Sequence, residues 1–173
     1  MSTISVVKER RVVVVGSGLA GLSAASQLVA HGIIVHMLER ATKPGGNSIK
    51  ASWGISGAPT KYQPGPPFSD SSFYADTIKS AGKAMGVKKK ERDVLISTLM
   101  KGSAEAVEWL VSKDVDLSAV AQLGGHGFPR THRGASKTPP GVSKITTLLH
   151  HSRPAHYSHS RRTVSSLRFS IPR

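Results

Sequence analysis

The spacing of hydrophobic positions changes along the first forty residues and predicts three consecutive elements. Residues 11–15 (Arg-Val-Val-Val-Val) form a short β-branched run, a pattern typical of a fully buried parallel strand, and residues 33–38 form a second β-rich run. Between them, apolar residues recur at helical spacing until Gly32, and glycine is a common helix stop. The region 11–39 is therefore predicted to form a βαβ unit, so the fold class is α/β with a parallel sheet.

Farther along, the pattern predicts a mostly helical region over residues 70–113. We expect Asp70 to cap a helix that runs through Ala81. Apolar positions at 94–99 indicate a second helix. Ser103 is then expected to cap a third helix, which ends near Val111.

The charge is unevenly distributed and marks a change of composition near the C-terminus. The chain has 173 residues, 24 Lys and Arg against 10 Asp and Glu, and a net charge of +14. Residues 1–116 hold 15 basic and all 10 acidic residues, whereas residues 117–173 hold 9 basic residues and no acid. A Ser/Arg/His-rich tail over 149–173 is too polar to bury much apolar surface, so we expect it to be disordered. Residues 1–148 are expected to form a partial, incomplete domain.

Composition also excludes some classes of protein. Cysteine is absent, so there are no disulfides. No stretch approaches the roughly 18 consecutive apolar residues of a membrane-spanning helix. The N-terminus lacks the apolar run of a secretory signal, and we expect an intracellular protein that is not secreted, in a compartment that stays open.

The turn between the first strand and the helix carries candidate chemistry. It contains the pattern Gly16-x-Gly18-x-x-Gly21 directly after a strand and at the start of a helix. In this context the glycines permit a tight turn, close approach of a pyrophosphate to the backbone, and close helix–strand packing. Glu39 follows Gly21 by 18 residues, at the end of the second strand, where a carboxylate can accept hydrogen bonds from ribose hydroxyls. The spacing predicts a dinucleotide site that disfavours NADP but leaves NAD and FAD open.

The segment after Glu39 resembles one family closely. Glu39-Arg40, followed by Gly45-Gly46-Asn47-Ser48-Ile49-Lys50-Ala51-Ser52, is similar to the flavoprotein subunits of soluble fumarate reductases and succinate dehydrogenases. The resemblance extends through the motifs Gly54-Ile55-Ser56-Gly57, Gln122-Leu123-Gly124-Gly125-His126 and Pro129-Arg130-Thr131-His132-Arg133, and covers roughly residues 11–148. It implies FAD as the cofactor and, in complete relatives, transfer of hydride from the flavin to fumarate, a dicarboxylate.

Carried over position by position, the resemblance implies a set of FAD contacts. Those to the pyrophosphate and the adenosine ribose are Gly16, Gly18, Ala20, Gly21 and Glu39. Further contacts are implied at Gly46, Asn47 and Ser48, and near the flavin at Ser52, Trp53 and Gly54. Two positions depart from the family pattern, because Trp53 replaces a usually small residue and Ser56 often corresponds to Asn.

The segment 125–133 offers two interpretations. Its Arg and His side chains suit a dicarboxylate, but we favour a structural segment. A metal site at His126 and His132 lacks a third ligand. The family's substrate-binding and proton-donating residues have no counterpart here, so no catalytic residue is predicted.

The leading hypothesis is an FAD-binding oxidoreductase of the fumarate reductase type, present as a catalytically incomplete chain. We hypothesise that the chain is truncated or frame-shifted, because acids and family resemblance both end near residue 149. One alternative is a basic protein that binds nucleic acid or another polyanion, which the scarcity of aromatic residues in the tail disfavours. Another is an NAD-binding Rossmann module, which leaves Gly45–Ser48 unexplained. The electron donor and the oligomeric state stay open.

Overall fold

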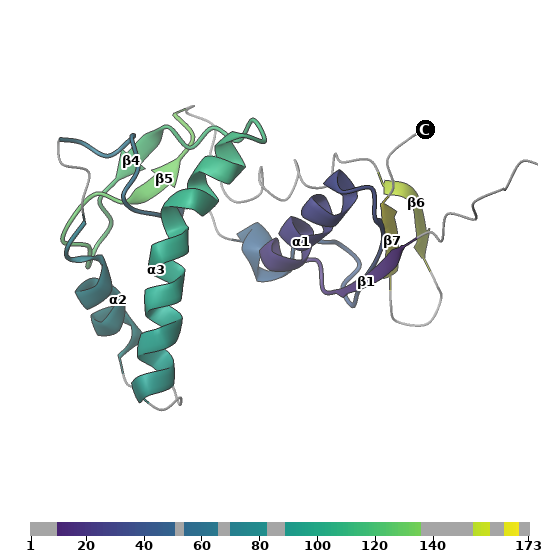
Figure 1. Cartoon of the computed structure of the whole chain (residues 1–173), viewed down its shortest axis with the longest axis horizontal. Coiled ribbons are helices and arrows are strands. Elements are labelled where there is room, and N and C mark those ends of the chain that lie inside the picture. Colours follow the sequence, from purple (N-terminus) through teal and green to yellow (C-terminus); the bar gives the residue numbers. More distant parts are fainter. Residues whose placement is uncertain are drawn as a thin grey trace, which may run out of the picture. The chain divides into compact units, whose positions relative to one another are not determined.

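The computed structural model describes residues 10–50, 54–65, 70–82, 89–135, 154–159 and 165–169. The chain divides into two compact units, labelled by element in Figure 1. The first unit is formed by residues 1–51 and 143–173, and the second by residues 52–142.

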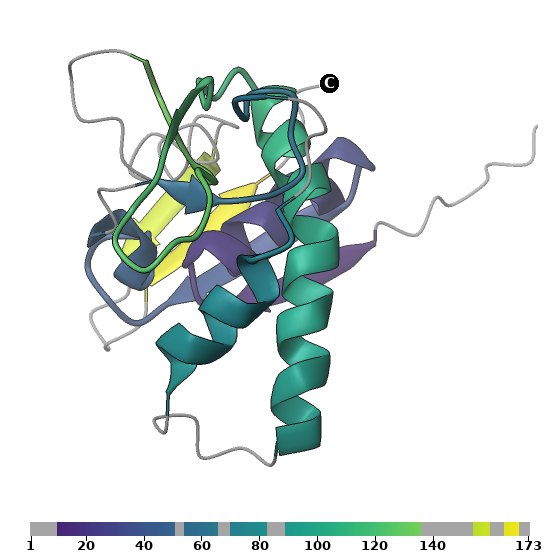
Figure 2. The same cartoon turned by 90° about the vertical axis from the view of Figure 1, so that its left-hand side faces the viewer.

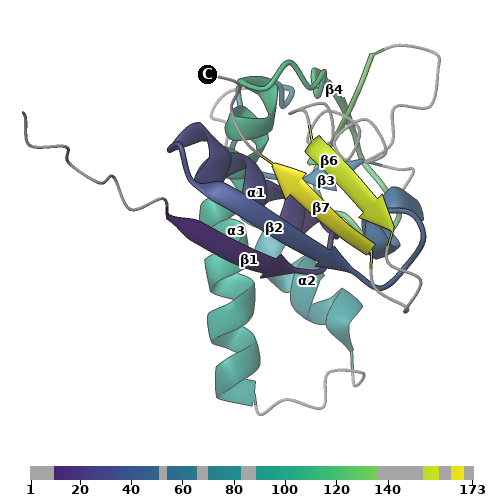
Figure 3. The same ribbon diagram turned by 90° about the vertical axis from the view of Figure 1, so that its right-hand side faces the viewer.

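The first unit contains the predicted βαβ arrangement. Its elements are β1 (Arg11–Val15), α1 (Leu19–Ala30), β2 (Ile34–Glu39) and a short 3-10 helix (Gly46–Lys50), followed late in the chain by β6 (Pro154–His159) and β7 (Ser165–Phe169). Strands β1 and β2 pair in parallel, with Val12 opposite Val35 and Val14 opposite Met37. Helix α1 packs on one face of the sheet (Figure 3). Val35 and Met37 of β2 are fully buried on that face. The α/β class and the parallel βαβ unit are confirmed.

The end of α1 shows why the chain turns back at Gly32. Gly32 has φ = 74°, a conformation that costs glycine little. The N–H of Gly32 donates to the carbonyl of Val29 (2.9 Å), and the N–H of Ile33 donates to that of Leu28 (3.0 Å). This pair of bonds is a Schellman motif, which satisfies the last carbonyls of the helix and directs the chain into β2.

The prediction that β1 is fully buried is wrong. Val13 and Val15 are 60% and 81% exposed, on the face opposite α1. Apolar side chains alternate between the two faces of a strand, and helix α1 covers only one of them. The run of valines indicated the strand but not which face is covered.

Two stretches of the basic tail are strands in the structure, and disorder of the tail over 149–173 stays a prediction. Strands β6 and β7 pair antiparallel, and β7 pairs antiparallel with β2, giving the sheet order β1-β2-β7-β6 (Figure 3). An edge strand has unpaired N–H and C=O groups. Strand β7 satisfies those on the outer side of β2, which composition alone does not indicate.

The second unit combines two helices with a small sheet. Its elements are β3 (Ile55–Ser56), α2 (Phe73–Ala81), α3 (Lys89–Val111), β4 (Ala119–Ala121) and β5 (Thr131–Arg133). The three strands form an antiparallel sheet in the order β3-β5-β4. Helices α2 and α3 pack against each other, as Figure 2 shows. Buried Phe73, Ile96, Val107 and Leu110 contribute to its core.

The helical region is confirmed, but two of its predicted caps are wrong. Helix α3 runs unbroken through Ser103, whose buried hydroxyl donates to the carbonyl of Met100 (2.8 Å) and accepts from the N–H of Ala58 (3.1 Å). Serine is tolerated in the middle of this helix because its hydroxyl oxygen is the hydrogen-bond acceptor for the buried N–H of Ala58. Asp70 does not cap α2, since its carboxylate accepts from the N–H and hydroxyl of Ser72 and faces Arg130 instead.

Candidate functional site

The glycine turn after β1 has the geometry that its sequence predicts. Gly16 has φ = 92°, and its N–H donates to the carbonyl of Leu38 (2.7 Å), which ties the turn to β2. A Cβ atom on Gly21 would lie 2.0 Å from the carbonyl oxygen of Gly16. A Cβ on Gly18 would meet nothing within 4 Å. Gly21 is therefore required for packing, while Gly18 leaves open space beside the backbone.

This open space lies at the N-terminus of α1. The N-cap residue of α1 is Gly18, so no side-chain hydrogen bond caps the helix. The first turn, which includes Ala20, contains no acidic residue. The positive end of the helix dipole and its first N–H groups form an environment that favours an anion. The N–H of Leu19 donates to the Ser48 hydroxyl (3.2 Å), so a second loop joins the helix terminus.

That second loop is the glycine-rich segment 45–48. Gly45 and Gly46 have φ values of 115° and 51°, and the 3-10 helix begins at Gly46. A Cβ on Gly46 would lie 3.4 Å from the Cα of Gly18, so the two loops approach closely. Asn47 is exposed at the start of the 3-10 helix. The structure thus brings together two glycine loops that are about 30 residues apart in the sequence.

Glu39 completes the cluster at the end of β2. Its Oε2 accepts hydrogen bonds from the N–H (2.9 Å) and the hydroxyl of Ser17, and its Oε1 accepts from the N–H of Ala41 (2.8 Å). Burial raises the pKa of the Glu39 carboxyl. The hydrogen bonds from Ala41 and Ser17 lower it more strongly, so its pKa lies below the ordinary value and the group is a carboxylate at neutral pH.

Ser17 is a residue of this site that sequence reasoning missed. It occupies a variable position of the glycine pattern, so the motif gives it no role. Its contacts to Glu39 join residues 22 positions apart, and only the tertiary structure brings them together.

The three positions expected near the flavin are placed differently. Ser52 and Trp53 lie outside the described residues. Gly54 belongs to the second unit, with φ = 125°, and a Cβ there would lie 2.3 Å from the carbonyl oxygen of His132. Close backbone packing therefore explains this glycine, and its contact with a flavin stays a prediction.

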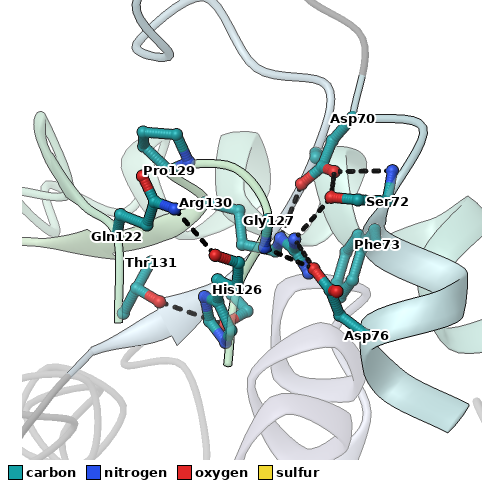
Figure 4. A network of polar contacts seen from close by, with 12 residues as sticks. Asp70, Ser72, Phe73, Asp76, Gln122, His126, Gly127, Pro129, Arg130 and Thr131 are labelled. Atoms are coloured by element: carbon teal, nitrogen blue, oxygen red, sulfur yellow. Dashed lines mark hydrogen bonds and ion pairs between the residues drawn. The ribbon is translucent and has the colours of Figure 1, made fainter. Parts of the chain in front are cut away.

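Of the four Arg and His side chains in segment 125–133, Arg130 and His132 are engaged within the second unit. Arg130 is 1% exposed and forms ion pairs with Asp70 (Nε–Oδ2, 2.5 Å) and Asp76, while its guanidinium lies 4.6 Å from the ring centre of Phe73 (Figure 4). His132 is fully buried beside the carbonyls of Leu117 and Gly57, at 3.1 Å from each.

The N–H of Gly127 donates to Asp76 (2.7 Å), so the loop before Arg130 is held by the same carboxylate. This bond and the Arg130 contact lower the pKa of Asp76 to about 2. Both buried side chains, Arg130 and His132, hold protein groups rather than facing a ligand. The geometry supports the structural interpretation of this segment.

Two further observations concern metals and membranes. Among the described residues, no three His, Cys, Asp or Glu side chains gather into a possible metal site. No helix in the described ranges has the length and hydropathy needed to cross a bilayer.

The residues around α1 fit a dinucleotide such as FAD. The glycine turn leaves backbone space, the helix terminus presents N–H groups to an anion, and Glu39 places a carboxylate at the end of β2. The fold and this cluster define a dinucleotide-binding α/β protein. A model of the FAD binding domain family matches residues 11–166, and the chain belongs to that family. The match extends past residue 148 into β7.

Similar proteins agree with this assignment. Fumarate reductase 1 of Saccharomyces cerevisiae is 48% identical over 141 residues, which cover 79% of this chain and 29% of the yeast protein. A fumarate reductase of Schizosaccharomyces pombe is 39% identical over 140 residues, covering 79% of this chain and 26% of that protein. The open conformation of a flavocytochrome c3 fumarate reductase has a TM-score of 0.66 and 26% identity, covering 84% of this chain and 25% of that one. The chain thus spans less than a third of the length of these relatives.

Proposed function

We propose that the chain binds FAD, with the dinucleotide site formed by residues of its first unit, and that it represents the FAD-binding part of an oxidoreductase of the fumarate reductase type. The observation that carries the proposal is the convergence of two glycine loops and one carboxylate at the N-terminus of α1. Gly16, Gly18, Ala20 and Gly21 form the turn for the pyrophosphate. The Glu39 carboxylate accepts hydrogen bonds from the hydroxyls of the adenosine ribose.

The second glycine loop supports FAD over NAD. Gly46 lies against Gly18, and Ser48 bonds the first residue of α1, so this loop extends the site beyond the three glycines of a general dinucleotide turn. In the proposed complex, Asn47 and Ser48 offer side-chain hydrogen bonds along the cofactor. Ser52, Trp53 and Gly54 are proposed to follow near the flavin.

The activity is proposed from the relatives. Two of the similar proteins are named fumarate reductases, and in such an enzyme the bound flavin supplies hydride to the substrate. A dicarboxylate of the fumarate or succinate type is therefore the proposed substrate of a complete protein. In this chain Arg130 and His132 are engaged with protein groups, and no catalytic residue is assigned. We expect no fumarate reduction by the 173-residue chain with reduced viologen.

Titration of the purified chain with FAD tests the proposal. We expect quenching of flavin fluorescence with saturation at one FAD per chain, and weaker binding of NAD. Glu39→Gln is expected to weaken FAD binding on the order of tenfold, because a neutral amide is a poorer acceptor for ribose hydroxyls. Glu105→Gln on the exposed face of α3 is the matched control and should bind FAD like the wild type. Saturable binding of NAD but not FAD, or salt-sensitive binding of nucleic acid alone, would contradict the proposal.

A further inference from the structure

Ser17 links three parts of the proposed FAD site. Its side chain is fully buried, at 0% exposure, in the turn between β1 and α1. Its N–H and its hydroxyl both donate to Oε2 of Glu39. The N–H of Gly45 donates to both the hydroxyl oxygen (3.0 Å) and the carbonyl oxygen (3.0 Å) of Ser17. One small side chain thereby joins the first glycine turn, the end of β2 and the second glycine loop.

The direction of these bonds follows from the chemistry of the groups. A carboxylate only accepts, so the single hydroxyl proton of Ser17 points to Glu39. The hydroxyl oxygen is then free to accept from the N–H of Gly45. The result is a chain from the Gly45 amide through the Ser17 hydroxyl to the Glu39 carboxylate, which ends in a charge-assisted bond.

This arrangement also bears on how the Glu39 carboxylate can take up a ligand. Oε2 accepts two hydrogen bonds from Ser17 and Oε1 accepts one from Ala41, and the backbone N–H of Arg40 also acts on the carboxylate. A carboxylate has about four acceptor positions. A ribose hydroxyl therefore has to share the carboxylate with these donors, which requires that the carboxylate keeps a fixed orientation.

We propose that Ser17 is a positioning residue that holds the Glu39 carboxylate and the Gly45 loop in place for the adenosine ribose before the cofactor binds. The inference rests on the proposed FAD site but goes beyond it, because Ser17 acts through Glu39. Without the hydroxyl, Oε2 keeps only one donor, the carboxylate can rotate, and Gly45 loses one of its two acceptors.

The first test measures Glu39 directly and needs no cofactor. The carboxyl carbon of Glu39 is titrated by 13C NMR and assigned with Glu39→Gln. Ser17→Ala is expected to raise the pKa of Glu39, because a donor to the charged form is removed. Ser26→Ala, a serine substitution within α1, is the matched control and should leave the titration unchanged. An unchanged Glu39 titration in folded Ser17→Ala would overturn the inference.

The second test measures the ribose contact. ADP and 2′-deoxy-ADP compete with FAD for binding to the wild type and to Ser17→Ala. We expect Ser17→Ala to weaken FAD binding on the order of tenfold and to reduce the preference for ADP over 2′-deoxy-ADP. On the Glu39→Gln background, Ser17→Ala should cause little additional loss.

The outcomes separate the inference from the proposed function. Absence of FAD binding by the wild type would overturn both. Normal wild-type binding, with an unchanged ADP preference and fully additive losses in the double variant, would overturn only the role of Ser17. Ser17→Cys, which keeps a side-chain donor but a weaker one, should fall between the wild type and Ser17→Ala, and provides a second variant if Ser17→Ala does not fold.

Discussion

The buried ion pairs of Arg130 should dominate the stability of the second unit. The guanidinium is 1% exposed, as is the side chain of Asp70, and Asp76 is 18% exposed. Arg130 also donates to the hydroxyl of Ser72 (3.1 Å) and packs over Phe73. Arg130→Met keeps most of the side-chain volume and removes the charge. It leaves two neighbouring carboxylates without their cation.

The magnitude follows from the burial. Removing one partner of a buried ion pair costs about 3–5 kcal/mol, because the other charge is left uncompensated in a medium of low polarity. A domain is stable by only about 5–15 kcal/mol in total. Arg130→Met should therefore remove about 3 kcal/mol or more of the free energy of unfolding, against less than about 0.5 kcal/mol for Arg133→Met, whose side chain is exposed.

Urea denaturation followed by circular dichroism and by tryptophan fluorescence measures this difference, since Trp109 lies on α3 of the second unit. Neutralising both acids in Arg130→Met/Asp70→Asn/Asp76→Asn should recover much of the loss, because no unpaired charge remains buried. A loss below about 1 kcal/mol in Arg130→Met, or one equal to that of Arg133→Met, would refute the reasoning.

Three further predictions test packing, a helix contact and acid stability. In thermal melts, Gly21→Ala should destabilise the first unit strongly, since the new Cβ would lie 2.0 Å from a backbone oxygen. In the same melts, Gly102→Ala in α3 should stabilise the protein by about 0.5–1 kcal/mol, because a Cβ there would meet nothing within 4 Å. Ser103→Ala should cost about 1–3 kcal/mol in urea denaturation, because the buried N–H of Ala58 loses its acceptor. The pKa of Asp76 is lowered to about 2 from 3.8, so the stabilisation it provides is present above the higher value and disappears as the pH falls through the lower one. Asp76→Asn should therefore be less stable than the wild type at pH 5 and approach it near pH 2, and a constant difference across this range would contradict that assignment.

Local patterns were sufficient to predict the βαβ unit. The valine run, the glycine turn and the helix stop at Gly32 each act over a few residues, and the structure contains β1, α1 and β2 in the predicted order, with α1 beginning inside the glycine turn, at Leu19. Helix α3 shows the limit of such patterns. Ser103 resembles an N-cap in the sequence, but in the structure its hydroxyl serves the amide of Ala58, 45 residues away.

The small sheet of the second unit had no readable signal. Strands β3, β4 and β5 have only two or three residues each, too few for an alternating pattern to be recognised. They form strands because β5 pairs with both β3 and β4 through backbone hydrogen bonds. The same is true of β7, whose pairing with β2 cannot be predicted from the composition of the tail.

The dinucleotide turn can be predicted from the sequence, because glycine conformations and strand–helix periodicity are properties of neighbouring residues. The sequence also located Glu39 through its distance from the turn. The folded chain was needed to show that Ser17 contacts Glu39 and that Arg130 pairs with buried carboxylates rather than facing a ligand. Ser17 and Glu39 are 22 positions apart in the sequence, and Arg130 and Asp76 are 54 positions apart. Both roles therefore depend on long-range contacts, and on burial, which decides whether a charged group contacts water or another part of the chain.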